Sequence, residues 1–395
     1  MKKYKLGELV NVKRGMSLSG EYYATEGNLI RLTLGNFQEE GGFKINTSKD
    51  DLYFTGPVRE EFVLKEGDII TPLTEQVVGL LGATARIPES NKYIQSGDVA
   101  LIKCISNEID DGYCYYLVSS DLVRRQLSAA AQQTKIRHTS PEKIMDCEVF
   151  IPEVKDQRKI AKLLDSINKK IELNEKINDN LSHMVQDVFV QMFADKTIHA
   201  NSCILDVASK ISDGEHGTVQ NTAGTPYYLL SCKNIKNGHL TIGSDERTIS
   251  EDTFKKLRNR TKLSKGDVLI TSVGSVGEAY LLNSEPSHIE FQRSVAMIKP
   301  NKKVVTSSYL FASLVFQQPR LVNAAHGAVQ QCLFLSDIEQ LPIYIPTKDE
   351  VDSFDSYVTP LLNTITENDD ENISLSLLRE WLLPMLMSGQ ATIAD

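Results

Sequence analysis

Two segments of the chain share one pattern of apolar and polar positions. Residues 151–193 and 345–387 both begin with Ile-Pro and then place apolar residues at alternating steps of four and three. This spacing puts the apolar side chains on one stripe of a long helix, as in a coiled coil. The first stripe is Ile160, Leu164, Ile167, Ile171, Asn174, Asn178, Leu181, Val185, Val188 and Met192. The second stripe is Phe354, Val358, Leu361, Ile365, Asn368, Asn372, Leu375, Arg379, Leu382 and Leu386. The matched stripes predict two long helices that pair within one chain.

Two asparagines interrupt each stripe at matching positions. Asn174 and Asn178 lie near the middle of the first stripe, and Asn368 and Asn372 lie near the middle of the second. An antiparallel pairing of the helices would therefore bring all four amides together. A buried amide needs a polar partner, so we expect these residues to fix the register of the pair. The alternative is that they face solvent where the helices separate.

The segments that precede the two helices are also related. Val99–Lys103 corresponds to Val295–Lys299, and Glu66–Ile70 corresponds to Lys265–Leu269. Single residues correspond as well: Leu6 with Leu205, Gly15 with Gly214 and Tyr116 with Tyr309. The offset between copies drifts within these modules but stays constant along the helices. Insertions and deletions therefore fall in loops of the modules, as expected where loops carry specificity.

Each module is predicted to mix strands and helices. Short apolar runs bounded by Gly, Asn and Ser predict strands: Asp68–Thr71, Val99–Cys104, Cys147–Ile151, Asp267–Thr271, Val295–Lys299 and Leu341–Ile345. Gly79–Ala85 and Val273–Ala279 predict tight turns, and Gly112–Ala131 and Ser307–Ala325 predict one helix in each module. The fold class is α+β (mixed α/β), with two similar domains separated by two long antiparallel coiled-coil helices. The predicted boundaries are 1–150 and 196–344 for the modules and 151–195 and 345–390 for the helices.

The composition fits a globular protein of two or three domains. The chain has 395 residues, of which 41% are hydrophobic, and its six cysteines are scattered without a C-x-x-C pair. We expect reduced thiols. The basic start lacks the apolar run of a signal peptide, and no stretch approaches the ~20 apolar residues of a membrane span. These features predict a cytoplasmic protein with no membrane partner.

The net charge of −9 taken alone counts against nucleic-acid binding, because neutralising phosphate requires Lys and Arg. The basic residues nevertheless gather locally, at Lys13-Arg14, Arg124-Arg125, residues 134–138 and residues 255–262. Acidic residues concentrate elsewhere, notably at 367–371 in the second helix. A charge run is often only a solvated helix face, so the charge pattern permits nucleic-acid binding without establishing it.

Sequence signatures of catalysis are missing. The chain has no G-x-x-x-x-G-K-[ST] phosphate loop, no H-E-x-x-H zinc motif, and no Asn-Pro-Pro-Tyr or Asp-Pro-Pro-Tyr tetrapeptide of an amino-methyltransferase. The glycines near Gly79 and Gly274 lack the G-x-G-x-x-G spacing and are interpreted as hairpin turns. We therefore expect a non-catalytic protein with no metal and no cofactor bound directly.

Five segments resemble the specificity (S) subunit of type I restriction-modification systems: residues 6–17, 64–70, 151–181, 263–269 and 377–390. The resemblance covers essentially the whole chain, including the order module, helix, module, helix. It implies two target recognition domains that each read half of a split double-stranded DNA sequence. It also implies docking of two methyltransferase (modification) subunits, with restriction subunits joining the complex. S-adenosylmethionine, ATP and Mg²⁺ are expected on those partner subunits.

The second helix departs from the first in two places. Val351 stands where the first helix has Gln157, and Arg379 stands where it has Val185. We therefore expect the two docking surfaces to be unequal.

Reading bases requires side chains that donate or accept in pairs, such as Arg toward guanine and Asn or Gln toward adenine. The candidate DNA-binding residues of the first module are Arg14, Ser17, Arg31, Thr74, Gln76, Gln133, Lys135 and Arg137. Those of the second module are Lys233, Asn234, Arg258, Arg260, Ser272, Ser275, Arg293 and Gln330. For any one of them, an ordinary surface role remains the alternative.

The helix pair would act as a spacer. The first stripe spans about 48 Å at 1.5 Å per residue, which corresponds to roughly 14 base pairs of DNA. Two other functions remain open: a coiled-coil scaffold whose modules bind proteins or small ligands, and a self-sufficient methyltransferase or nuclease.

Overall fold

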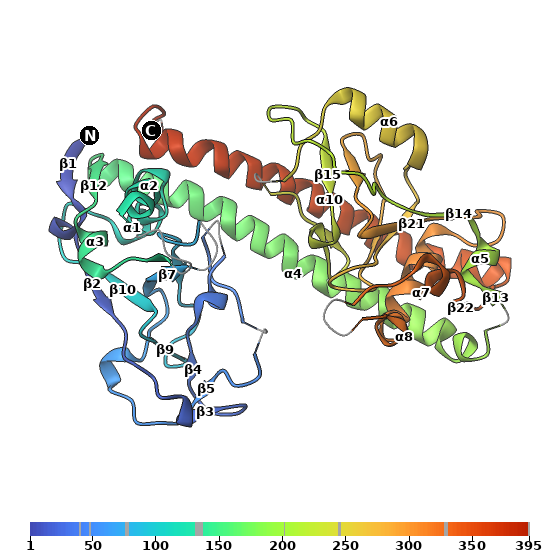
Figure 1. Cartoon of the computed structure of the whole chain (residues 1–395), viewed down its shortest axis with the longest axis horizontal. Coiled ribbons are helices and arrows are strands. Elements are labelled where there is room, and N and C mark those ends of the chain that lie inside the picture. The colour runs from blue at the N-terminus through green and yellow to red at the C-terminus, as the bar shows by residue number, and fades with distance from the viewer. Residues whose placement is uncertain are drawn as a thin grey trace. The chain divides into compact units, whose positions relative to one another are not determined.

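The computed structural model describes residues 1–38, 41–46, 49–75, 79–130, 137–200, 202–243, 246–327 and 331–393. The chain divides into two compact units, Met1–Ile167 with Arg379–Asp395 and Asn168–Leu378. Each unit contains one strand-rich module and a part of each long helix (Figure 1). The finer four-part division made from the sequence stays a prediction.

The two long helices are present. Helix α4 spans Val154–Ile198 and helix α10 spans Lys348–Met387. Each begins shortly after its Ile-Pro pair, because proline disfavours helical geometry in the residue before it and cannot donate a backbone hydrogen bond. Acidic residues occupy both first turns, where they favour the positive end of the helix dipole.

Each unit has a four-stranded antiparallel sheet with the same strand order, β2-β10-β6-β8 in the first and β14-β21-β18-β19 in the second. The strands of the first sheet are β2 (Val10–Arg14), β10 (Val99–Cys104), β6 (Ile69–Pro72) and β8 (Ala85–Arg86). Those of the second are β14 (Ala208–Asp213), β21 (Val295–Pro300), β18 (Val268–Thr271) and β19 (Ala279–Leu281). The predicted duplication of the modules is therefore confirmed.

Further pairings repeat between the units. Strands β1 (Lys2–Lys5) and β12 (Glu148–Ile151) pair in the first, as β13 (Ser202–Cys203) and β22 (Pro342–Ile343) do in the second. Buried Asp68 forms an ion pair with Lys103, and buried Asp267 forms the equivalent pair with Lys299.

The modules differ in their outer elements. The first has a small sheet in the order β3-β5-β4-β9: β3 (Tyr23–Ala24), β5 (Tyr53–Phe54), β4 (Ile30–Arg31) and β9 (Tyr93–Ile94). It also pairs β7 (Thr74–Glu75) with β11 (Arg137–His138). The second pairs β15 (Tyr228–Leu230) with β20 (Ile289–Phe291) and β16 (Ile235–Lys236) with β17 (His239–Leu240), and it adds α6 (Glu251–Thr261). The short helices are η1 (Leu6–Glu8), η2 (Gly20–Tyr22), η3 (Leu34–Asn36), η4 (Glu60–Phe62), η5 (Cys232–Asn234), α3 (Pro141–Met145), α5 (Ile204–Val207) and α9 (Leu335–Glu339).

The prediction of one helix in each module after the sheet is wrong. The first module has α1 (Asp111–Val118) and α2 (Asp121–Ala130), and the second has α7 (Ser307–Phe316) and α8 (Gln318–Ala324). The hydroxyls of Ser119 and Ser120 bond back to carbonyls of α1, which competes with continuation of the helix. In the second module Pro319 opens α8 because it cannot continue α7.

Two residue correspondences also need correction. Leu6 is buried and its counterpart is the buried Ile204, because Leu205 is exposed. The N-cap side chain of α1 accepts the Tyr113 amide, and the N-cap side chain of α7 accepts the Tyr309 amide. Tyr113, not Tyr116, is therefore the counterpart of Tyr309. The first error has a structural cause, because β14 carries an irregularity between Ala208 and Lys210 that β2 lacks. One extra residue there shifts the offset by one.

The buried face of α4 is not on the same side of the helix along its whole length. In the first unit, Ile160 and Leu164 of α4 share a core with Leu386 of α10, as predicted. In the second unit, the buried apolar positions of α4 after Val185 are Phe189 and Phe193, whereas the predicted Val188 and Met192 are only half-buried. A straight helix has 3.6 residues per turn, so a strict heptad stripe drifts around it. Aromatic packing on Tyr309 and Phe354 sets the buried face at this end.

Candidate nucleic-acid interface

The end of the first sheet strand is fixed by a close backbone crossing in each module. The amide of Gly15 donates to the Val99 carbonyl at 3.0 Å, and that of Gly214 donates to the Val295 carbonyl at 3.1 Å. A Cβ at Gly15 would lie 2.1 Å from the carbonyl oxygen of Ser96, and one at Gly214 would lie 2.2 Å from that of Phe291. Only glycine fits such a crossing. These crossings place equivalent loops at the ends of the two sheets.

Arg14 and Ser17 flank the first crossing and are exposed. They are therefore accessible to a ligand. In the second module, Ser275 and Arg293 are exposed, and the Arg293 amide donates to the Glu215 carbonyl beside the crossing. These four candidates lie near the corresponding strand ends of the two modules.

Four candidate arginines already contact carboxylates. Arg31 is buried, pairs with Asp51 at 3.0 Å and stacks over the Tyr23 ring. A guanidinium held in this way has few donors left for a base.

Arg258 lies in a similar setting. Its Nε is 2.5 Å from the Glu290 carboxylate, and its Nη2 donates to the carbonyls of Pro286 and Ile289. Burial raises the pKa of Glu290, and the hydrogen bond and charge of Arg258 oppose that rise. Arg258 therefore serves first to hold α6 against β20.

Arg137 acts on the backbone of residues 79–81 through Glu75 of β7. It lies 2.8 Å from Glu75, whose other oxygen accepts the backbone amides of Gly79, Leu80 and Leu81. Arg137 also donates to the carbonyl and hydroxyl of Ser128. The Arg137–Glu75 pair thus holds the backbone of residues 79–81.

The remaining described candidates are also engaged. Asn234 is buried and donates to Thr241 and Glu246, and Lys233 pairs with the same Glu246. Arg260 pairs with Glu215 at 3.3 Å and stays partly exposed. Thr74 and Ser272 are buried in the sheet region. Four candidates lie outside the described residues: Gln76, Gln133, Lys135 and Gln330.

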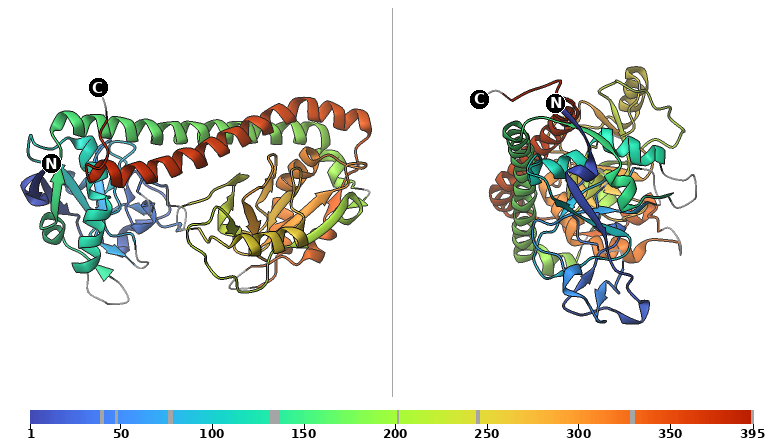
Figure 2. Two further views of the ribbon diagram at one scale, coloured as in Figure 1. Left: turned by 90° about the horizontal axis from the view of Figure 1, so that it is seen from above. Right: turned by 90° about the vertical axis from the view of Figure 1, so that its left-hand side faces the viewer.

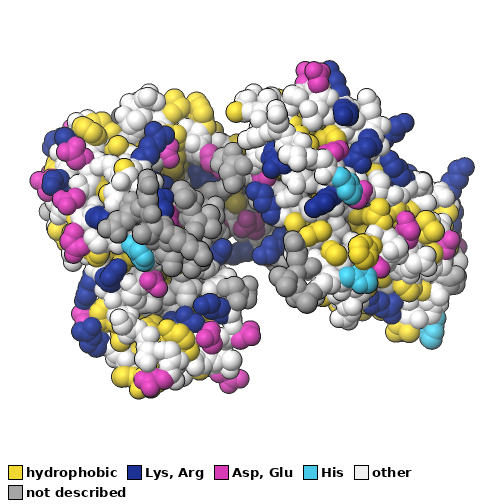
Figure 3. Space-filling view, viewed as in Figure 1, with side chains coloured by type: hydrophobic (Ala, Val, Ile, Leu, Met, Phe, Trp, Pro, Cys, Tyr) yellow, Lys and Arg dark blue, Asp and Glu magenta, His cyan; other side chains and the backbone are white. Residues whose placement is uncertain are grey.

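Sequence reasoning predicted the basic run at 255–262 but missed two lysines, Lys210 and Lys299, that lie beside the C-terminal end of α6. Lys210 donates to the Arg260 carbonyl at 2.8 Å, and Lys299 donates to the Lys262 carbonyl at 2.6 Å. Burial, followed by the charges of Lys299, Arg260 and Lys262, lowers the pKa of Lys210. Figure 3 shows Lys and Arg side chains gathered over α6. The run at 255–262 pointed to α6, but the two lysines come from distant strands.

The four helix asparagines meet in the second unit, where α4 and α10 lie side by side (Figure 2). Asn174 Nδ2 donates to Asn372 at 2.9 Å, and Asn368 Nδ2 donates to Asn178 at 2.7 Å. Asn178 Nδ2 donates in turn to Asp369 at 2.8 Å. Residue numbers rise along one helix as they fall along the other, so the helices are antiparallel.

Gln157 and Val351 differ because the modules are anchored differently. Gln157 accepts the Asp110 amide at 2.8 Å and donates to two carbonyls of its own module. The second helix uses Asp355 instead, one turn further on, to accept from Thr306 and Ser308. This difference concerns the attachment of each module to its helix.

In the part of the chain that the structure describes, no three His, Cys, Asp or Glu side chains are arranged to hold a metal ion. Within the same residues, no helix combines the length and apolarity needed to cross a membrane.

Comparison with known proteins identifies the class. The family model described as type I restriction modification DNA specificity domain matches residues 1–183. The specificity subunit of the type I restriction enzyme MjaIX of Methanocaldococcus jannaschii is 23% identical over 301 residues, covering 72% of this chain and 69% of the relative. The EcoBI specificity subunit of Escherichia coli is 21% identical over 339 residues, covering 78% and 68%.

A solved structure agrees in fold. The S subunit of a type I restriction-modification system from M. genitalium has a TM-score of 0.55 at 15% identity, covering 98% of this chain and 96% of that one. The first module and most of the first long helix are therefore similar to this DNA specificity domain. Over most of its length the chain is similar to specificity subunits of type I restriction-modification systems, the family that the resemblance indicated.

Proposed function

We propose that this chain selects the DNA sequence on which a type I restriction-modification complex acts, and that its target is split into two halves. The observation that carries the proposal is the repeated sheet topology, which puts equivalent strand ends in both modules while their outer loops differ. Equivalent frameworks would approach DNA in equivalent ways. Different loops would read different bases, so the two halves need not match.

The candidates for DNA contact at these strand ends are the exposed side chains Arg14, Ser17, Ser275 and Arg293. Gln76, Gln133, Lys135 and Gln330 lie outside the described residues and remain proposed contacts. The cations around α6, among them Arg260 and Lys262, suit phosphate oxygens, which need charge rather than a hydrogen-bond pattern.

The helix pair would set the spacing between the two half-sites. Both units include segments of α4 and of α10. The hydrogen-bonded asparagines would hold one register, because a shift would leave buried amides without partners.

Partner docking is proposed for the outer surfaces of the helices. Helix α4 exposes Leu173 and Met184, and α10 exposes Tyr357 and Trp381. Aromatic and large apolar side chains at a surface are typical anchors of protein interfaces. Two modification subunits would bind there, and restriction subunits would join the complex.

Catalysis would belong to the partners. Methylating a base requires flipping it into a pocket beside S-adenosylmethionine, and the sequence offers no motif for such a pocket. S-adenosylmethionine, ATP and Mg²⁺ would therefore bind to partner subunits. This chain would supply only the choice of site.

The test is methylation mapping in cells that contain the modification subunit encoded with this chain. We expect a split methylated motif that disappears when the chain is deleted. Exchanging the second module for that of a relative should change one half of the motif and leave the other half intact. A motif that survives deletion, or that changes in both halves, would contradict the proposal.

The docking part is tested by co-purifying the modification subunit with Trp381→Ala. Leu122→Ala, at an exposed apolar residue of α2 in the first module, serves as the matched control. Loss of the partner with Trp381→Ala alone is the expected result. Equal recovery with both variants would exclude this surface of α10.

A further inference from the structure

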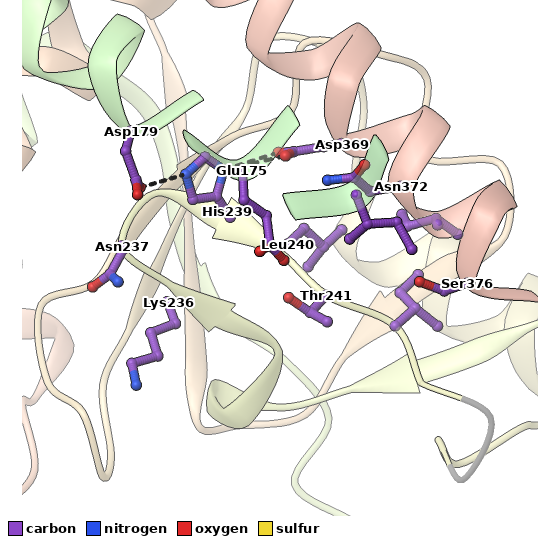
Figure 4. A pocket seen from close by; sticks show the side chains of 13 residues that line it. Glu175, Asp179, Lys236, Asn237, His239, Leu240, Thr241, Asp369, Asn372 and Ser376 are labelled. Carbon is purple, nitrogen blue, oxygen red and sulfur yellow. Dashed lines mark hydrogen bonds and ion pairs between the residues drawn. The ribbon is translucent and has the colours of Figure 1, made fainter. Parts of the chain in front are cut away.

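A hairpin of the second module reaches the polar layer of the helix pair. Strands β16 and β17 are joined by Asn237 and Gly238, whose φ values of 52° and 80° suit a tight hairpin turn. The next residue, His239, projects between α4 and α10, where it lines a cavity of about 300 Å³ (Figure 4). The side chain of His239 is mostly buried, with 19% exposed.

Asp369 joins the histidine to both helices. His239 Nδ1 lies 3.2 Å from Asp369 Oδ1 on α10. The same carboxylate oxygen accepts from Asn178 Nδ2 of α4 at 2.8 Å. One carboxylate thus connects the hairpin, α4 and α10.

The surroundings of His239 are acidic on both helices. On α4, Asp179 lies 3.8 Å from His239 Nε2, and Glu175 lines the same cavity. On α10 the facing group is Asp369. The hairpin itself contributes Lys236 to the cavity lining, and its Asn237 amide is bound by Glu278 from the adjoining loop.

This set of charges favours an imidazolium. Burial acts to lower the pKa of His239, but the hydrogen bond and charge of Asp369, with the charges of Asp179 and Glu175, outweigh it and raise that pKa. Burial, helped by nearby carboxylates, raises the pKa of Glu175. Without a cation at His239, the three carboxylates would repel one another in a region poorly screened by water.

Among the described residues of the first module, no side chain makes a counterpart of this contact. Asn36 is the third residue of η3, and Asn234 is the third residue of η5. The Asn36 carbonyl accepts the Lys44 amide, and the Asn234 carbonyl accepts the Thr241 amide, so Lys44 corresponds to Thr241. Gly42 stands two residues before Lys44, as His239 stands two residues before Thr241, so Gly42 is the counterpart of His239 in the sequence. A glycine has no side chain to reach a helix, so the contact is specific to the second module.

We propose that His239 is a positioning residue whose protonated side chain fastens the second module's hairpin to the asparagine layer of the helix pair, so that DNA reading by this module weakens as pH rises. The DNA part rests on the proposed function, whereas the fastening itself does not.

The direction of this pH dependence follows from the linkage between protonation of His239 and stability of the fold. A histidine whose pKa is higher in the folded protein contributes stability that is fully present below its unfolded value of about 6.5. That contribution is lost as pH rises through the raised folded pKa. The hairpin should therefore be held firmly at pH 6 and loosen above neutrality.

The first experiment follows hydrogen exchange in the hairpin of the full chain between pH 6 and 9, corrected for intrinsic exchange. We expect wild-type protection to fall by about tenfold for each unit by which the folded pKa exceeds the unfolded one. His239→Gln keeps a hydrogen-bond donor but has no charge, so its hairpin should exchange fast at every pH. Asp369→Asn should flatten the profile in the same way.

His288→Gln is the matched control, because His288 is an exposed histidine of the same module. It should keep the wild-type profile. A His239→Gln profile that still follows the wild type would overturn the proposal. If either variant fails to fold, the wild-type chain still decides: an NMR titration that gives His239 a pKa at or below 6.5 would also overturn it.

The second experiment measures binding of the complex to its methylated motif and to DNA altered in one half, at pH 6.5 and 8.5. We expect the higher pH to weaken discrimination at the half read by the second module, and His239→Gln to weaken it at both pH values. Absence of any sequence-selective binding would contradict the proposed function and leave the exchange result standing. Selective binding with equal pH response in both halves would overturn the DNA part of this inference.

Discussion

At the scale of single residues, the backbone crossing at Gly15 has no room for a side chain. Gly15→Ala would press a methyl group against the Ser96 carbonyl, where a Cβ would lie 2.1 Å away. We expect a loss of roughly 3 kcal/mol of unfolding free energy, since a clash with backbone can be relieved only by moving a strand. Gly97→Ala, whose Cβ would lie 3.7 Å from its nearest neighbour, is the control in urea unfolding. Equal losses in the two variants would contradict the crowding.

Arg258 offers a second test at this scale. Arg258→Met should leave the Glu290 carboxylate, 1% exposed, without its ion-pair partner and cost about 3 kcal/mol. The double variant with Glu290→Gln should regain much of that stability, because an amide tolerates burial better than a lone charge. Thermal unfolding of the two variants measures the difference. A DNA-reading role alone would instead leave stability unchanged and reduce only the affinity.

The candidate residues show what sequence reasoning can reach at this scale. Residue type selected side chains whose chemistry suits DNA, and two of them, Arg14 and Arg293, are exposed at strand ends. Their contact with DNA stays a prediction. Residue type could not distinguish the exposed Arg14 and Arg293 from Arg31, Arg137 and Arg258, which are held by carboxylates. The carboxylates that engage those three are brought to them by the fold and lie 20 to 62 positions away in the chain (Asp51, Glu75 and Glu290).

At the scale of elements, the heptad pattern predicted the long helices because it repeats along the chain itself. It did not predict where the buried face turns. Beyond Val185 the face of α4 is set by Tyr309 and Phe354, which arrive from α7 and α10. Likewise, the break between α1 and α2 depends on Ser119 and Ser120, whose hydroxyls donate to backbone carbonyls of α1. The sequence does not show that these hydroxyls bond to the backbone rather than to solvent. Local periodicity is readable from sequence, whereas competition between local and tertiary partners is not.

Helix α6 carries a prediction about charge. Lys256 and Arg260 lie one turn apart on its exposed face, and Lys262 follows at its end in a left-handed conformation. If these cations bind phosphate, Lys256→Ala with Lys262→Ala should lower the slope of log affinity against log salt by about 0.9 for each phosphate that is no longer neutralised. Sequence preference should stay the same. Anisotropy titrations from 50 to 300 mM salt, roughly the range over which such slopes are resolved, measure both quantities.

The control for α6 is Lys348→Ala, since Lys348 is exposed and pairs with Asp352 on α10. Its salt slope should match that of the wild type. An unchanged slope in the α6 variant would remove this surface from the DNA interface. A changed sequence preference would instead make these lysines base readers.

At the scale of the whole molecule, duplication explains why the architecture was predictable while the target is not. Two copies of one framework leave matching signals at matching offsets, and the strand order confirmed what those signals predicted. Under the proposed function, the bases would be read by loops, which are the parts that differ between the two modules. A framework shared by both modules carries no information about what distinguishes them.

The spacer role makes the last prediction. Inserting one heptad after Ile167 in α4 and one after Leu378 in α10 adds matching turns to both antiparallel helices and leaves the asparagine layer intact. Seven residues lengthen a helix by about 10.5 Å, which equals about three base pairs. The methylated motif should keep both half-sites and gain about three base pairs between them. An insertion in α4 alone should instead break the register and destabilise the chain. If the doubly extended protein folds and methylates with unchanged spacing, the helices do not set the distance between half-sites.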